Sequence, residues 1–179
     1  EVLKHKNVRS VCMVELDARV TELCSRYLSW DKGALLDPRV QVFFEDAALL
    51  LPKIATTRQF DVAIVDSTQP VDGSVAGPLV QVSFLETLGS LLRPGGLIAG
   101  YGVNAAPVGQ SIRRQIRERT LQVLAGDLIE YVVPCPFYSA SFAYQIWSSK
   151  ASDLQDRIIS AFASSSVASD CAMDVRSLV

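Results

Sequence analysis

The chain has 179 residues, of which 49% are apolar and 20% are charged. That length suits one domain with a real hydrophobic core, and that composition is typical of a globular protein rather than a disordered one. Seventeen basic and nineteen acidic residues give a formal net charge of −2. A weakly acidic chain without a basic block offers no electrostatic reason to expect nucleic acid or an anionic membrane as a partner.

The cysteines and the hydropathy exclude two further classes. The four cysteines contain no CxxC pair, and His5 is the single histidine that could join them as a metal ligand. A metal site is therefore not expected. No apolar run reaches the roughly 18 residues that a membrane helix needs. Without a signal peptide, and with thiols expected to be reduced, the protein is predicted to be cytoplasmic. The chain starts at Glu1 without a Met, so we expect its natural beginning to lie upstream.

Apolar stretches of strand length alternate with amphipathic stretches of helix length along the chain. The expected strands are 8–14, 40–44, 60–65, 97–101, 128–133 and 142–147. The expected helices are 17–28, which Asp17 caps, 47–51, which Pro52 stops, 79–92, 107–124 and 154–162.

This alternation predicts an α/β fold of the Rossmann-like, class I methyltransferase-like type. We expect a mostly parallel sheet with helices on both faces and an antiparallel strand pair near the C-terminus. Residues 1–150 are predicted to form the nucleotide-binding domain, truncated at its N-terminal side. Residues 151–179 are predicted to form a C-terminal helix and a loose tail.

Acidic residues follow three consecutive strands of the predicted sheet. Glu15 ends the first strand, Glu45 and Asp46 follow the second, and Asp66 follows the third. In an open α/β sheet, ligands bind beyond the carboxyl ends of the strands, where a carboxylate can accept hydrogen bonds from a ribose diol. A second carboxylate can bind an adenine amino group, which leaves the third for proton chemistry.

An acid after a strand can also be a simple helix cap, which is the structural alternative at any one of these positions. Three such acids in register favour a ligand over three caps. The pattern alone indicates an adenosine-type ligand on a Rossmann-like sheet, and methyltransferases share that pattern.

Several motifs together resemble the spermidine synthase family, the aminopropyltransferases. The resemblance runs from Glu1 to about Lys150. The first matching segment, Glu1-Val2-Leu3-Lys4-His5, looks like the helix after the family's glycine-rich loop. The others are Val14-Glu15-Leu16-Asp17, Glu45-Asp46-Ala47, Pro136-Phe137-Tyr138 and Asp61-Val62-Ala63-Ile64-Val65-Asp66-Ser67-Thr68-Gln69-Pro70. The last is the most specific, because it resembles the family's DVIIxDSxDP sequence.

The resemblance implies a reaction and a set of site residues. Decarboxylated S-adenosylmethionine would be the co-substrate, with no permanently bound cofactor, and a diamine such as putrescine would accept its aminopropyl group. Glu15 would bind the ribose and Asp46 the adenine, with Ala47, Asp66 and Ser67 also belonging to the site of the adenosyl donor. Asp66 would act as the base, and Gln69 and Tyr138 would contact the amine. Relatives of this kind imply a homodimer or homotetramer for the full-length protein.

The sequence departs from the family pattern on the amine side. Gln69 replaces the family's second aspartate, so a charge-assisted contact becomes a neutral one. Tyr101 and Val103 stand where relatives have a polar pocket wall, and Ala106 stands in place of an aromatic residue. Three hypotheses follow: an aminopropyltransferase with a changed amine preference, a catalytically impaired homologue that serves as a nucleotide-binding or regulatory subunit, and a methyltransferase. We expect these 179 residues by themselves to be inactive, because the glycine-rich loop and the small β-domain of the family are missing.

Overall fold

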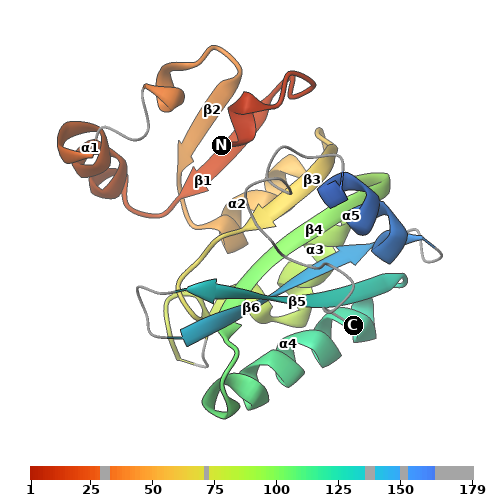
Figure 1. The fold of residues 1–179 in the computed structure, drawn as a ribbon. Coiled ribbons are helices and arrows are strands. Elements are labelled where there is room, and N and C mark those ends of the chain that lie inside the picture. Colours follow the sequence, from red (N-terminus) through yellow and green to blue (C-terminus); the bar gives the residue numbers. More distant parts are fainter. Residues whose placement is uncertain (29–32, 71–72, 136–139, 150–152, 164–179) are drawn as a thin grey trace. The chain divides into compact units, whose positions relative to one another are not determined.

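A computed structural model describes residues 1–28, 33–70, 73–135, 140–149 and 153–163 of the chain. These residues form two compact units, the first over Glu1–Lys53 and the second from Ile54 onward. Each unit contains a hydrogen-bonded sheet of its own, as Figure 1 shows.

The first unit is built on two parallel strands, β1 (Val11–Glu15) and β2 (Val40–Phe44). A single 3-10 turn, η1 (Val2–Lys4), precedes them where a helix was expected, because the chain turns at His5 into extended backbone. β1 begins at Val11 and not at Val8, since the ladder to β2 starts with the pair Val11 and Val40.

Helices lie between the two strands and after the second one. The connection between β1 and β2 contains α1 (Ala18–Tyr27) and the short turn η2 (Ala34–Leu36). The expected cap of α1 is confirmed, because the Asp17 side chain accepts a hydrogen bond from the Arg19 backbone N–H. After β2 comes α2 (Ala47–Ile54).

α2 corrects one expectation, since the helix continues through Pro52 and does not stop there. Proline has no N–H, so Pro52 cannot bond to the carbonyl of Ala48, four residues earlier. The helix tolerates this loss because it ends at Ile54, only two residues after the proline.

The second unit is built on a four-stranded mixed sheet in the order β3-β4-β6-β5. Its strands are β3 (Phe60–Val65), β4 (Leu92–Asn104), β5 (Asp127–Cys135) and β6 (Ala140–Ser148). β3 and β4 are parallel, whereas β6 is antiparallel to both β4 and β5. The parallel pair and the C-terminal antiparallel pair confirm the predicted α/β class.

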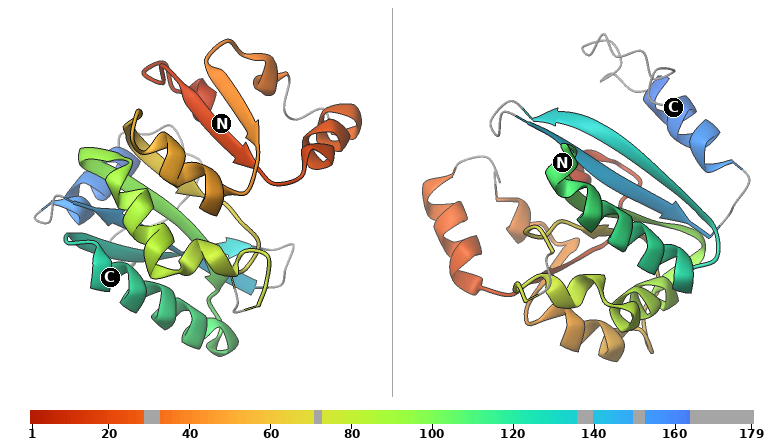
Figure 2. Two further views of the ribbon diagram at one scale, coloured as in Figure 1. Left: turned by 180° about the vertical axis from the view of Figure 1, so that it is seen from behind. Right: turned by 90° about the horizontal axis from the view of Figure 1, so that it is seen from below.

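Helices cover both faces of this sheet. Figures 1 and 2 show α3 (Val82–Ser90) and α4 (Gln110–Val123) against one face and α5 (Leu154–Ala163) across the other. The turns η3 (Gly77–Val80) and η4 (Pro107–Gly109) lead into α3 and α4. The sequence predicted α-helices that begin at residues 79 and 107, but in both cases a tighter 3-10 turn precedes the α-helix.

β4 is longer than expected because it begins at Leu92, before the Arg93–Gly96 turn. Its ladder to β3 pairs Phe60 with Leu92 and then Val62 with Leu97, so the turn forms an irregularity within the strand. Gly95 has φ +81, a conformation that glycine adopts without steric cost.

The core of the second unit lies between the sheet and the helices α3 and α4. Leu85 of α3 and Ile116 of α4 are fully buried, and Ile98, Val103 and Trp147 of the sheet are nearly so. Burying a side chain of this size contributes about 1.5–3 kcal/mol. β4, the strand that pairs with β3, therefore belongs to the well-packed core of the second unit.

Candidate functional site

Glu15 and Asp46 lie at the same edge of the two-stranded sheet in the first unit. Glu15 pairs with Phe44 in the parallel register, and Asp46 comes two residues after Phe44 on the neighbouring strand. The carboxyl ends of parallel strands share one edge, so both side chains are delivered there, as the sequence predicted. Both residues are half-buried.

Each of these two carboxylates bonds to the backbone at the start of the next turn. Glu15 Oε1 accepts a hydrogen bond of 3.0 Å from the Asp17 N–H. Asp46 Oδ1 accepts one of 2.8 Å from the Ala48 N–H, so Asp46 caps α2, with Ala47 as the first helical residue. A cap uses one carboxylate oxygen, and the other oxygen can still accept from a ligand hydroxyl or amino group.

Asp66 belongs to the second unit and directly follows Val65, the last residue of β3. Its side chain is exposed, as is that of Gln69, whereas Pro70 is buried. The Ser67 hydroxyl donates to the carbonyl of Thr68 at 3.0 Å. The segment thus presents a carboxylate and an amide to solvent at the carboxyl end of a parallel strand.

Gly100 of β4 lies beside the end of β3 and lets the two backbones approach closely. It pairs with Val65 in the parallel ladder. A Cβ atom at this position would lie 2.3 Å from the Val65 carbonyl oxygen. Only glycine fits this spacing without a shift, so Gly100 permits the close approach of β4 to Val65, the residue before Asp66.

Tyr101, the next residue, has an unusual backbone conformation and a buried side chain. Its φ is +59, the single positive value among the non-glycine residues that the structure describes. The side chain is 4% exposed, and its hydroxyl donates to the Leu79 carbonyl at 2.8 Å. Burial raises the pKa of Tyr101, so the hydroxyl keeps its proton and remains a donor.

Tyr101 and Val103 were expected to form a wall of the amine pocket, and the structure places both in the core. Val103 is only 1% exposed. The physical reason is a bulge in β4, which turns both side chains toward α3 and α4 and away from the strand's other face.

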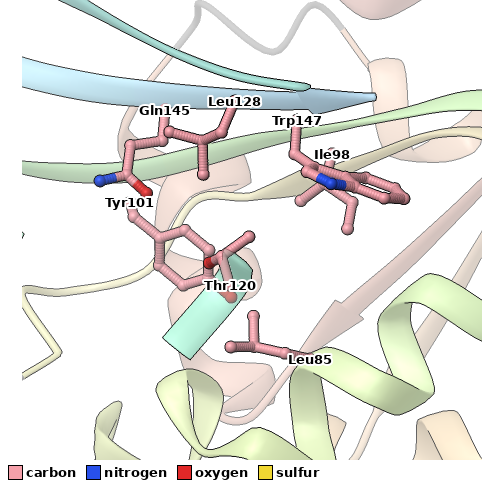
Figure 3. Close-up of a pocket in the computed structure, with 7 residues that line it drawn as sticks. All are labelled: Leu85, Ile98, Tyr101, Thr120, Leu128, Gln145 and Trp147. Carbon is pink, nitrogen blue, oxygen red and sulfur yellow. The ribbon is translucent and has the colours of Figure 1, made fainter. Parts of the chain in front are cut away.

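A small cavity lies beneath the sheet on this side, as Figure 3 shows. Its lining side chains come from β4, β5, β6, α3 and α4: Leu85, Ile98, Tyr101, Thr120, Leu128, Gln145 and Trp147. The volume is about 10 Å³, room for roughly one water molecule, so it cannot hold a nucleotide. Two buried polar atoms beside it, Gln145 Oε1 and Trp147 Nε1, have no hydrogen-bond partner among the described residues.

The sequence-predicted site residues therefore form two groups, each within its own unit. Glu15, Asp46 and Ala47 share one edge in the first unit, and Asp66, Ser67 and Gln69 follow β3 in the second. Tyr138 lies outside the described residues. Across the described ranges, no three His, Cys, Asp or Glu side chains are grouped as a metal site, and no helix is long and apolar enough to cross a membrane.

The sequence interpretation missed the hydrogen bond that Tyr101 makes across the fold. A signal for it was present, because Tyr101 stands between Gly100 and Gly102 within a strand. Glycine inside a strand often marks a bulge or a close backbone approach.

The fold places the chain among α/β proteins of the Rossmann-like kind. Spermidine synthase from Thermotoga maritima superimposes with a TM-score of 0.74, and a spermidine synthase in complex with the transition-state analogue AdoDATO superimposes with 0.77. Both are 24% identical in sequence and are matched over 87% of this chain.

The sequence comparison is more specific. The profile of the spermine/spermidine synthase domain matches residues 1–156, so the chain belongs to the spermine/spermidine synthase family. Polyamine aminopropyltransferase 2 of Pseudomonas aeruginosa is 32% identical over 83% of this chain. Polyamine aminopropyltransferase of Pyrobaculum neutrophilum is 37% identical over 59% of it.

The chain spans only part of these relatives. It covers 42% of the Pseudomonas protein, 37% of the Pyrobaculum protein and about half of each of the two solved structures.

Proposed function

We propose that this protein transfers an aminopropyl group from decarboxylated S-adenosylmethionine to an amine and releases methylthioadenosine. The observation that carries the proposal is the exposed Asp66 at the carboxyl end of β3, within a segment that resembles the most specific motif of its family. Membership of the spermine/spermidine synthase family supports the same reaction class.

The donor is proposed to bind through the acids of the first unit. A ribose diol offers two hydroxyl donors, which suit the carboxylate of Glu15. Asp46, at the same edge, would accept from the adenine amino group while it caps α2, and Ala47 would line the base. Both acids keep a defined direction because each is bonded to a backbone N–H.

Asp66 is proposed to take the proton that the attacking amine must lose. An ammonium has no lone pair, so the acceptor has to be deprotonated before or during attack. The amine nitrogen then forms a bond to the aminopropyl carbon, the bond from that carbon to the sulfonium sulfur breaks, and its electron pair stays on the sulfur of methylthioadenosine. An exposed carboxylate directly after the carboxyl end of a strand can reach such a proton.

Gln69 and Tyr138 are proposed to contact the amine. Gln69 is exposed three residues after Asp66, where the family pattern has an acid. An amide oxygen accepts a hydrogen bond but lacks the charge that strengthens contact with an ammonium. We therefore infer a preference for an acceptor different from that of the family pattern.

A second candidate is a homologue that binds the nucleotide but transfers poorly, and the observation that favours it is also Gln69. Without the acid that the family pattern has at position 69, the binding of a dication would be weakened, whereas the donor acids of the first unit are retained. The two candidates differ in whether any amine gains an aminopropyl group.

The test uses the protein encoded by the complete open reading frame, with decarboxylated S-adenosylmethionine and a panel of putrescine, cadaverine and spermidine. We expect an amine heavier by one aminopropyl group in mass spectrometry, and a rate about 10²–10⁴ lower for Asp66→Asn. Asp61→Asn is the matched control, because Asp61 is an exposed acid on the same strand, ion-paired with Arg93. It should retain its rate.

The remaining outcomes separate the candidates. Binding of methylthioadenosine without any amine product would support the binding homologue, and Gln69→Asp should then raise activity toward putrescine. Methyl transfer from S-adenosylmethionine would overturn both candidates. An equal loss in Asp61→Asn and Asp66→Asn would refute the role of Asp66 as the base.

A further inference from the structure

Two tyrosines, Tyr131 of β5 and Tyr144 of β6, stack on each other in the sheet of the second unit. They are partners in the antiparallel register, and their ring centroids lie 5.6 Å apart with an angle of 23° between the ring planes. Aromatic pairs at this separation attract each other beyond the area that they bury, so each ring limits the movement of the other. Both residues are only half-buried, so part of this aromatic surface is accessible to solvent.

These rings lie on the face of the sheet opposite to α3 and α4. The neighbours of Tyr144 along β6, Ala143 and Gln145, are buried, and Gln145 lines the cavity together with residues of α3 and α4. Successive side chains of a strand point to opposite faces, so Tyr144 points to the other one. On that face, α5 follows Ser148, which pairs with Leu97 in the first half of β4, and Figures 1 and 2 show the helix at the end of the sheet where β6 finishes. The tyrosines lie further toward the carboxyl end of β4.

Gly102 of β4 makes room for the ring of Tyr144. A Cβ atom at position 102 would lie 2.7 Å from Cε1, 3.0 Å from Cζ and 3.2 Å from the hydroxyl oxygen of Tyr144. The hydroxyl end of the phenol therefore lies over the backbone of β4, which is the strand between β6 and β3. Within the described ranges, no other group forms a hydrogen bond with this hydroxyl, so it can bond to a ligand.

The stacked tyrosines occupy the same row of the sheet as Asp66, the proposed base. The preceding row crosses all four strands and consists of Val65, Gly100, Gln145 and Glu130. Tyr144 and Tyr131 come one residue further toward the carboxyl end of β3, where Asp66 follows directly after the strand. The register therefore aligns the proposed base with the aromatic pair.

The alternation along β3 places Asp66 on the same face as the tyrosines. Ala63 pairs with Ile98, which lines the cavity against α3 and α4, so Ala63 and Val65 point toward these helices. Ile64 points to the opposite face and is 60% exposed, and Asp66 is the next position of that alternation and is exposed as well. Two strand spacings, about 10 Å, separate Asp66 from Tyr144 along the row. The phenol covers about half of that distance, because it lies over β4.

We propose that Tyr144 contacts the acceptor amine, and that its hydroxyl accepts a hydrogen bond from the far ammonium of a diamine whose reacting nitrogen lies at Asp66. This inference rests on the proposed function for the role of Asp66. The reacting nitrogen gives its proton to Asp66, whereas the far nitrogen stays protonated and offers three donors. The faces of the two rings attract a cation and pack against methylene groups. A neutral hydroxyl and an aromatic surface thus provide part of the contact that the family pattern assigns to an acid at position 69.

The test measures the Kd of two amines for the protein encoded by the complete open reading frame, with methylthioadenosine bound. Putrescine and n-butylamine share a carbon chain of the same length, but butylamine lacks the far ammonium. We expect Tyr144→Phe, which keeps the ring, to raise the Kd of putrescine about tenfold, since the net worth of such a hydrogen bond is close to that factor. The Kd of butylamine should stay within about twofold. Tyr27→Phe removes the hydroxyl of an exposed tyrosine of α1 and is the control, which should change neither constant.

A second variant, Gly102→Ala, displaces the ring and leaves the hydroxyl in place on it. Gly102 has no positive φ, so the alanine is strained only by its contact with the far end of the Tyr144 side chain. We expect the Kd of putrescine to rise in this variant too. An unchanged Kd of putrescine in both Tyr144→Phe and Gly102→Ala would overturn the inference. So would an equal weakening of putrescine and butylamine in Tyr144→Phe, because the hydroxyl would then not act on the far ammonium.

The proposed function is judged separately, from aminopropyl transfer by the wild type. Transfer by the wild type together with unchanged amine binding in Tyr144→Phe would refute the contact and leave the proposed function standing. Weaker binding of putrescine in Tyr144→Phe without any transfer by the wild type would support the contact and refute the transferase function.

Discussion

Replacing Gly100 with alanine tests how closely β3 and β4 approach at the start of the proposed catalytic segment. The new Cβ would lie 2.3 Å from the Val65 carbonyl oxygen, whereas contacts shorter than 3.0 Å are essentially never seen. The overlap is 3.0 − 2.3 = 0.7 Å against backbone, which cannot rotate aside as a flexible side chain can. Overpacking of this kind costs about 1–3 kcal/mol, and strain at φ +156 adds to it.

The assay is urea or thermal unfolding, monitored by circular dichroism. A loss of about 3 kcal/mol should lower the melting temperature of a domain of this size by roughly 10 °C. Gly73→Ala is the matched control, because Gly73 has φ +82 but its Cβ would meet nothing within 4 Å. It therefore reports the cost of positive φ alone. If Gly100→Ala costs no more than Gly73→Ala, the reasoning from close approach is refuted.

The pKa values of Asp17 and Asp37 are lowered from 3.8 to about 2, and the largest cause is the hydrogen bonding from Arg19 and Arg39, respectively. A carboxylate with a lowered folded-state pKa stabilises fully above its unfolded value and loses that effect as pH falls. The free energy of unfolding, measured by urea titration, should therefore fall as the pH is lowered from about 4 to about 2. The fall should be less steep in Asp37→Asn, and an unchanged slope in that variant would contradict this reasoning. In the core, Gln145→Met should stay within about 1 kcal/mol of wild type, because it removes an unpaired buried oxygen. Ile116 is fully buried, so Ile116→Ala should lower the free energy of unfolding by about 2–5 kcal/mol. Equal losses for the two variants would contradict the expectation for Gln145, because they would show that the hydrogen bonds of its amide outweigh the cost of its unpaired oxygen.

Periodicity and turn chemistry were sufficient to predict the order and type of most elements. β2 and β3 have the predicted bounds, because short β-branched runs between breakers leave little choice of register. The cap at Asp17 followed from local chemistry alone. The predicted stop at Pro52 was wrong, because a proline near a helix end removes one bond without forcing the helix to stop.

Non-local geometry could not be predicted in the same way. The bulge of β4 depends on how that strand pairs with β6, which lies about 40 residues further along the chain. A tyrosine at position 101 was expected on a pocket wall, whereas the bulge buries it. The roles of Glu15, Asp46 and Asp66 came from strand-end positions and from resemblance, and they stay predictions for ligand binding.

The placement of both ends of the segment 66–80 on Gly100 and Tyr101 has a consequence for how such a protein can evolve. A loop whose ends are fixed at neighbouring residues can change between them with little entropic cost, since closure depends only weakly on length. Under the proposed function, a substitution such as the glutamine at position 69 would alter what the loop recognises and leave the strand end that carries Asp66 in place. If the proposed function holds, divergence in the choice of acceptor can accumulate while the proposed point of proton removal stays constant.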